Sequence, residues 1–228
     1  MPTELPTLTM QLMLSSLFNI TVIAEWCCFI AAIIFLPRRT GKWRLFIPLL
    51  FITILAETVG WYLWNILGKG NNGWIFNINL LINISFSVWM FSTVESLQKV
   101  KVKLFLLLFL FIAFAVCNTF FFEGPWVYNR FTDIAGNIIL AVISCYFFYT
   151  VLNEDAFRNL FRYEYYWFAN GLLFYSLGSV VLNVFLNYLW EYHKQTGVNI
   201  YGYINYGINV LLYGSFIIAF ICRRRNTS

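Results

Sequence analysis

Polar side chains spaced four residues apart occur inside strongly apolar segments of this sequence. The pairs are Asn79 with Asn83, Asp133 with Asn137, Asn183 with Asn187, and Asn205 with Asn209. Residues four apart share one face of a helix, and lipid offers amides no hydrogen-bonding partner. These faces should therefore turn inward and enclose a polar cavity that binds a small polar solute. The predicted ligand-binding residues are Glu57, Trp61, Asn79, Asn83, Asn137, Asn183, Asn205, Tyr206 and Asn209.

Two carboxylates, Glu25 and Glu57, also lie deep inside apolar segments. Ionisable groups at such depth are rare and usually functional. We expect Glu57 to face the cavity, where it is a candidate proton carrier. For Glu25 two interpretations stay open, a second proton carrier and a buried structural acid.

Other chemistries lack the residues that they need. The lysines lie in predicted loops or at predicted helix ends, so none can form a retinal Schiff base. The sole histidine, His193, lies in a predicted loop, whereas zinc-dependent membrane hydrolases need several histidine ligands. We therefore predict no catalytic residue, metal or cofactor, although acid-catalysed hydrolysis by Glu25 and Glu57 is left open as a minor hypothesis.

The composition shows which elements must position these residues. Of 228 residues, 61% are hydrophobic and 11% charged, against about 25% charged in ordinary soluble domains. A spanning helix needs about 20 mostly apolar residues, and seven runs supply them. We predict an all-α, multi-pass integral membrane protein with one transmembrane domain, residues 1–228. Its predicted spans are 10–36, 45–67, 74–97, 104–122, 131–152, 165–190 and 200–222.

The orientation follows from the loop charges, because Lys and Arg near helix ends stay on the cytoplasmic side. The basic stretches 37–44, 98–103, 153–162 and 223–225 would share one side, and the poorly basic loops 68–73, 121–130 and 191–197 the other. We predict an external N-terminus and an internal C-terminus in the plasma (inner) membrane. The basic rim would contact anionic lipid, and no nucleic-acid partner is expected because the bases are scattered.

An internal repeat is a further prediction. Ile78-Asn79 and Ile82-Asn83 recur 126 residues later as Ile204-Asn205 and Ile208-Asn209, and Tyr62-Leu63-Trp64 recurs as Tyr188-Leu189-Trp190. This pattern indicates a parallel three-one-three arrangement, in which repeat A is 10–97, the connector helix is 104–122 and repeat B is 131–222. Ligand sites tend to lie at the interface of such repeats.

This plan, the chain length, and the asparagines of the third and seventh predicted helices resemble the SWEET sugar facilitators and their PQ-loop relatives. The resemblance is one of architecture, and it implies asparagines that face the substrate and a facilitative transport activity. That family carries prolines in its first, second, fifth and sixth helices, and many members carry a Pro-Gln motif. Here only Pro48 lies inside a predicted span and no Pro-Gln dipeptide occurs.

Three functions remain open at this stage. The first is a receptor-like sensor that binds a small solute from outside and signals through a separate cytoplasmic or membrane partner. The alternative is a SWEET-like facilitative or proton-linked small-solute transporter, which would need a polar path through the inner half of the bundle. The third is a structural membrane subunit, because intramembrane amides are often ties between helices, worth about 0.6 to 2 kcal/mol each.

Overall fold

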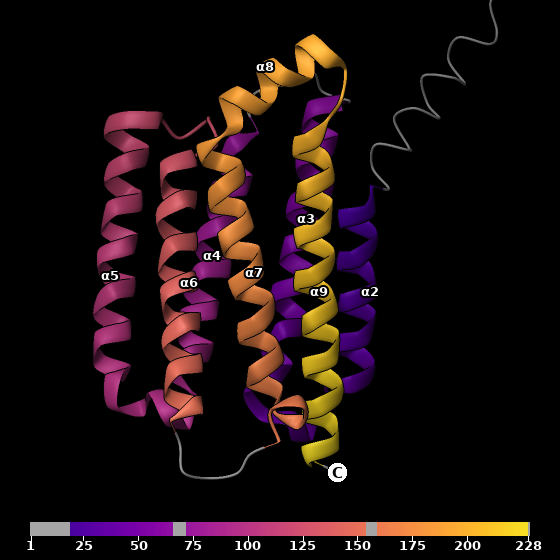
Figure 1. Cartoon of the computed structure of the whole chain (residues 1–228), viewed down its shortest axis with the longest axis vertical. Helices are drawn as coiled ribbons and strands as arrows, with labels where there is room; N and C mark the ends of the chain where they lie inside the picture. The colour runs from indigo at the N-terminus through magenta and orange to yellow at the C-terminus, as the bar shows by residue number, and fades with distance from the viewer. Residues whose placement is uncertain (1–18, 66–71, 154–158, 228) are drawn as a thin grey trace, which may run out of the picture.

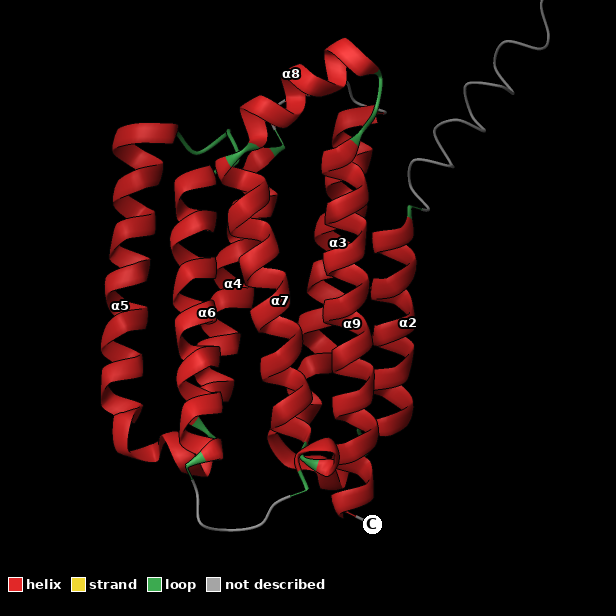
Figure 2. Ribbon diagram, viewed as in Figure 1, coloured by secondary structure: helices red, strands yellow, loops and turns green. Residues whose placement is uncertain are grey.

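The computed structural model describes residues 19–65, 72–153 and 159–227, and the regular structure of these residues is helical (Figures 1 and 2). The longer helices are α2 (Ile20–Phe35), α3 (Phe46–Asn65), α4 (Gly73–Ser92), α5 (Lys101–Asn118), α6 (Arg130–Leu152), α7 (Glu164–Val184), α8 (Leu186–Thr196) and α9 (Ile200–Thr227). Short helical turns connect several of them, namely η1 (Arg38–Leu45), η2 (Glu95–Val100), η3 (Thr119–Glu123) and η4 (Leu160–Arg162).

Several of these helices can cross a membrane, which confirms the predicted class of an all-α integral membrane protein. Within the described residues, six helical stretches are long and apolar enough to span a bilayer, and α2 is a shorter apolar helix of 16 residues. The predicted first span began at residue 10, and residues 10–18 lie outside the described part. The described chain thus has six or seven spanning helices, and the count of seven stays a prediction.

Six helices form a closed ring. Going round it, α2 contacts α3, α3 contacts α4, α4 contacts α6, α6 contacts α7, α7 contacts α9, and α9 contacts α2 again. Helix α5, which corresponds to the predicted connector, packs on α4 and α6 at the edge of the bundle (Figure 1). It exposes apolar side chains such as Val102 and Phe109, as expected for a helix that faces lipid. The internal repeat stays a prediction.

We call the end of the bundle that carries α8 the α8 end, and the opposite end, where α9 finishes, the C-terminal end (Figure 1). Helix α2 begins at the α8 end, where the Asn19 side chain caps it by accepting a hydrogen bond from the Val22 backbone N–H at 3.0 Å. A side-chain cap of this kind satisfies one of the free N–H groups at a helix start.

The predicted span 165–190 is wrong after residue 184, because α7 ends at Val184 and a new helix, α8, lies across the end of the bundle (Figure 1). The side chain of Arg130, on α6, donates to the Val184 carbonyl at 3.3 Å and to Asn187 Oδ1 at 3.4 Å. Basic groups commonly satisfy the last free carbonyls of a helix in this way. The polar residues of α8 then lie at the surface instead of inside the membrane.

The C-terminal half of the bundle is filled by aromatic side chains. Phe46, Phe168 and Phe220 are fully buried, and the Phe46 ring centroid lies 5.8 Å from that of Phe168 and 5.1 Å from that of Phe220. Trp43 stacks on Phe46 at 5.4 Å. Edge-to-face and offset contacts at these distances are favourable beyond the area that they bury. We call Trp43, Phe46, Phe168, Phe216 and Phe220 the aromatic plug.

The contact between α7 and α9 depends on Gly171. A methyl group added there would lie 2.8 Å from Ser215 Cβ and 3.2 Å from the Leu212 carbonyl oxygen. Gly214, on α9, differs, because nothing lies within 4 Å of the equivalent position on it. Sequence alone could not separate the two glycines, because the difference is set by the helix opposite.

We expect Gly171→Ala to lower the Tm of the purified protein by about 2 to 12 °C, the range given by an overpacking cost of about 1 to 3 kcal/mol. Gly214→Ala is the matched control and should not lower the Tm, because alanine favours the helix by about 1 kcal/mol. Thermal unfolding in lipid nanodiscs measures both. Equal Tm values for the two variants would contradict the close approach of α7 and α9.

Candidate functional site

A cavity of about 290 Å³ lies inside the ring and is lined by residues of all six ring helices. This volume is near the lower end of the usual range for small-molecule pockets. Its polar lining residues are Thr21, Glu25, Thr53, Glu57, Asn79, Asn83, Ser87, Tyr128, Asp133, Asn137, Tyr175, Tyr201, Asn205, Asn209 and Tyr213.

Most of the predicted ligand-binding and proton-carrying residues line this cavity: Glu25, Glu57, Asn79, Asn83, Asn137, Asn205 and Asn209. Three others are not among its lining residues. Trp61 and Tyr206 are half-buried on α3 and α9. Asn183 is buried and donates to Asp133, which does line the cavity. That any of these residues binds a ligand stays a prediction.

Helices α3 and α4 share a polar network on one wall. Asn83 Nδ2 donates to Asn79 Oδ1 at 3.0 Å and to Thr53 Oγ1 at 3.4 Å. Ser87 Oγ donates to the Asn83 backbone carbonyl at 2.8 Å. Because Asn79, Asn83 and Ser87 are spaced four apart, one face of α4 carries all three.

Asp133 is the centre of a second network on another wall, between α6 and α7. Its carboxylate accepts from Asn137 Nδ2 at 2.6 Å, from Asn183 Nδ2 at 2.7 Å and from Ser179 Oγ at 3.3 Å. All four side chains are buried. Asp133 also lies in the first turn of α6, where the helix dipole favours negative charge. Three donors and the dipole thus hold this carboxylate in place.

Glu25 connects α2 to α9. Its Oε1 accepts a hydrogen bond from the Tyr213 hydroxyl at 3.0 Å, and the side chain is 2% exposed. Its second oxygen, Oε2, is buried and has no hydrogen-bond partner among the described residues. Glu57, on the neighbouring helix α3, is half-buried and lines the same cavity. A buried carboxylate oxygen without a partner is costly, so this wall is incomplete as it stands.

Tyrosines stand at the α8 end of the cavity. Tyr128, in the loop before α6, and Tyr201, in the first turn of α9, line it and are 40% and 38% exposed. The loop is fixed on α4, because Asn77 Nδ2 donates to the Val127 carbonyl at 2.8 Å and Asn77 Oδ1 accepts from the Asn129 N–H at 2.8 Å. The cavity lining thus includes partly exposed side chains at the α8 end, and we call this end of the cavity the mouth.

The opposite end of the cavity is closed. Phe46, Phe86, Leu172 and Phe216 line it there, and Phe46 and Phe216 belong to the aromatic plug. The Phe46 ring lies 5.4 Å from that of Phe216 and 4.8 Å from that of Phe86. The described side chains thus give the cavity a polar wall and an apolar floor.

Five lining residues were not among the predicted site residues, namely Tyr128, Asp133, Tyr175, Tyr201 and Tyr213. Four of these five could have been found by extending the spacing of four. On α9 the stripe runs Tyr201, Asn205, Asn209, Tyr213, and on α7 it runs Tyr175, Ser179, Asn183. Thr21 and Glu25 repeat the pattern on α2. No such signal exists for Tyr128, because a loop contact places it.

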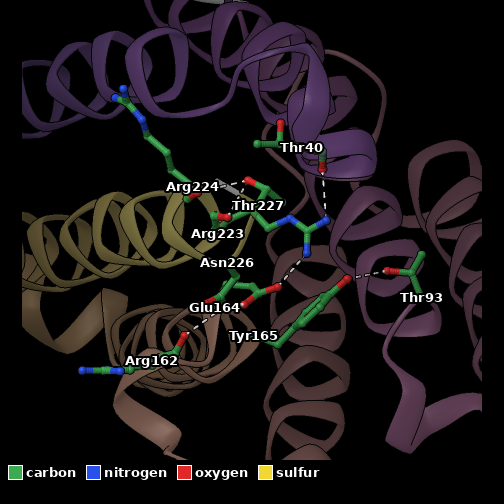
Figure 3. Close-up of polar contacts among 9 residues, drawn as sticks. All are labelled: Thr40, Thr93, Arg162, Glu164, Tyr165, Arg223, Arg224, Asn226 and Thr227. Carbon is green, nitrogen blue, oxygen red and sulfur yellow. Dashed lines mark hydrogen bonds and ion pairs between the residues drawn. The ribbon is translucent and has the colours of Figure 1, made fainter.

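A polar cluster connects several elements at the C-terminal end of the bundle (Figure 3). Arg223 of α9 pairs with Glu164 of α7 at 2.9 Å and donates to the Thr40 backbone carbonyl at 3.4 Å. Asn226 Nδ2 donates to the other Glu164 oxygen at 2.8 Å. The side chain of Glu164 is 6% exposed. We call Glu164, Arg223 and Asn226 the C-terminal clasp.

The lining of the cavity is rich in groups that can form hydrogen bonds with a small molecule. Amide, hydroxyl and carboxylate groups from several helices line one cavity, and the C-terminal end of this cavity is apolar. Among the described residues, no group of three or more His, Cys, Asp and Glu side chains could hold a metal ion. Comparison of the chain with protein-family models, with curated proteins and with solved structures finds no match.

Proposed function

We propose that this protein is a receptor-like membrane sensor that binds a small solute in the ring cavity and signals through a separate partner. The observation that carries the proposal is the cavity itself. It has polar and aromatic walls from six helices, a mouth at the α8 end, and a closed floor. A cavity that was only a tie between helices would be filled by side chains, so the unfilled volume supports ligand binding over a purely structural role.

The aromatic plug favours a sensor over a transporter. A transported solute has to leave on the far side of the membrane, which needs a polar path or an opening through the C-terminal half. Phe46, Phe168 and Phe220 occupy that half and are fully buried. Displacing such packed rings is costly. The two cavity carboxylates keep a proton-linked transporter as the second candidate, with Glu57 and Glu25 as proton carriers.

The charge distribution supports an external mouth. Basic residues at the C-terminal end include Lys42, Arg44, Lys99, Arg162 and Arg223 to Arg225. Among the described residues the α8 end carries Arg130 and Lys194. By the positive-inside rule the C-terminal end is cytoplasmic, which would place the mouth outside the plasma (inner) membrane.

The signal would pass along α7 and α9. Both helices contribute to the cavity wall, through Tyr175 on α7 and Asn205 and Asn209 on α9. Both also end in the C-terminal clasp, where Glu164 pairs with Arg223. A ligand that binds one packing of these helices more tightly increases the population of that packing. A cytoplasmic or membrane partner at the C-terminal end could detect the change.

This proposal predicts a solute that stabilises the wild-type protein and fails to stabilise a cavity variant. At a concentration of about 100 Kd such a solute adds about 2.7 kcal/mol, which raises the Tm by about 5 to 10 °C. The Asn83→Leu and Asn209→Leu double variant should lose this shift. A library of small polar solutes, screened by thermal unfolding in nanodiscs, makes the measurement.

Asn153→Leu is the matched control, because this exposed asparagine lies at the end of α6 and not on the cavity. It should keep the full shift. A double variant that loses stability, together with a wild-type protein that no solute shifts, would support the structural role instead. Solute uptake into proteoliposomes that Glu57→Gln abolishes would support transport.

A further inference from the structure

We infer that the ligand of this cavity is an organic cation, an ammonium compound with a small apolar or aromatic body. The inference rests on the proposed function and names the chemical class that the site would take. It follows from three features of the described cavity wall, which are its carboxylates, the lack of lysine, arginine and histidine among its described lining residues, and its aromatic rings.

Three carboxylates line one space of about 290 Å³, namely Glu25, Glu57 and Asp133. Asp133 is held by three neutral donors. Glu25 differs, because only its Oε1 has a partner, the Tyr213 hydroxyl. Glu25 Oε2 is buried in the cavity wall and has no partner among the described residues. Glu25 therefore lines the cavity with one carboxylate oxygen that no described group satisfies, and a nearby ligand cation would stabilise this carboxylate.

No lysine, arginine or histidine is among the residues that line the cavity in the described part of the chain. The basic side chain of α6, Arg130, instead donates to Val184 and Asn187. Buried charges in proteins are normally paired, because an unpaired one is very costly. Because no described lining residue is basic, these three carboxylates leave two solutions within the described part of the chain, uptake of protons or binding of a cation.

The aromatic walls favour the cation. Tyr175, Phe76 and Tyr201 line the cavity together with the carboxylates, and a cation held over a ring face gains about 0.5 to 2 kcal/mol. Protonation of the carboxylates would gain no stabilisation from these rings. Because the mouth tyrosines Tyr128 and Tyr201 are partly exposed, an ammonium group can pass between rings before it meets Glu25 and Glu57. The ammonium can belong to a free amine or to a lipid headgroup.

The test uses three probes of similar shape and different charge: 2-phenylethylamine, neutral 2-phenylethanol and anionic 3-phenylpropanoate. Each is titrated by calorimetry against the full chain in phosphatidylglycerol nanodiscs, which contain no ammonium. We expect 2-phenylethylamine to bind at least tenfold more tightly than the other two. Glu57→Gln and Glu25→Gln should each weaken it at least tenfold, because each removes an opposite charge at close range. Glu191→Gln, on the exposed face of α8, should leave it unchanged.

The other outcomes separate the two proposals. Equal or tighter binding of 2-phenylethanol or 3-phenylpropanoate would overturn the cation and leave the sensor standing. Binding of 2-phenylethylamine that survives both carboxylate variants, each shown to be folded by its Tm, would also overturn it. Failure of all three probes would overturn the cation, and a solute library without a hit would then overturn the sensor as well. A Tm raised by phosphatidylethanolamine in the nanodisc, and lost in Glu57→Gln, would support the same ammonium site with a lipid headgroup as its source.

Discussion

Arg223→Met is expected to lower the Tm by about 6 to 20 °C, because leaving a buried charge without its partner costs about 3 to 5 kcal/mol. The pair joins Arg223 and Glu164 at 2.9 Å, and their side chains are 27% and 6% exposed. Methionine keeps much of the arginine volume, so the main loss is the charge. Glu164 would then keep its hydrogen bond from Asn226 but lose its cation.

Lys194→Met is the matched control. Lys194 and Glu191 also pair at 2.9 Å, but their side chains are 55% and 61% exposed. Exposed pairs contribute about 0 to 1 kcal/mol, so this variant should shift the Tm by no more than about 4 °C. Thermal unfolding of both variants in the same nanodiscs compares two ion pairs that have the same N–O distance and differ in burial. If the two Tm shifts were equal, the clasp would not stabilise the bundle.

The inward-facing amides could be predicted from the sequence, because helical spacing puts them on one face and the membrane requires that face to turn toward other helices. Asn79 and Asn83 share a face, and lipid cannot satisfy them, so they turn toward other helices. The same reasoning led to Asn137, Asn205 and Asn209, which line the cavity. Trp61 and Tyr206 were also predicted to line the cavity, but neither is among its lining residues. Aromatic side chains are stable against lipid as well as in a cavity, so spacing and depth do not fix where they point.

What could not be predicted depends on contacts between distant residues. The end of α7 at Val184 is set partly by Arg130, which is 54 residues away in sequence. The clasp likewise joins Glu164 to Arg223, 59 residues apart, and the sequence showed Arg223 only as one base of a basic tail. The difference between Gly171 and Gly214 could not be predicted for the same reason, because it depends on which residues lie next to each glycine in space.

Asp133→Asn is expected to destabilise the protein by about 2 to 6 kcal/mol, which lowers the Tm by about 4 to 24 °C. The Asp133 carboxylate accepts from Asn137, Ser179 and Asn183. An asparagine keeps one acceptor oxygen, and its NH₂ group must face either Asn137 or Asn183, which are themselves donors there. The new NH₂ group and the NH₂ group that it faces are then two buried donors without an acceptor at this contact, at about 1 to 3 kcal/mol for each group.

Glu57→Gln separates this network effect from the removal of cavity charge. Both substitutions convert a cavity carboxylate into its amide, but Glu57 is half-buried and Asp133 is buried with three donors on it. If repulsion among the cavity carboxylates dominated, both variants would be more stable than the wild type. If the hydrogen bonds dominate, Asp133→Asn alone loses stability while Glu57→Gln keeps or raises the Tm. We expect the second result, because three short-range donors to a buried carboxylate outweigh the repulsion from carboxylates on other helices. If the Tm of Asp133→Asn were equal to or above that of the wild type, repulsion from the other carboxylates would outweigh the hydrogen bonds that Asp133 accepts.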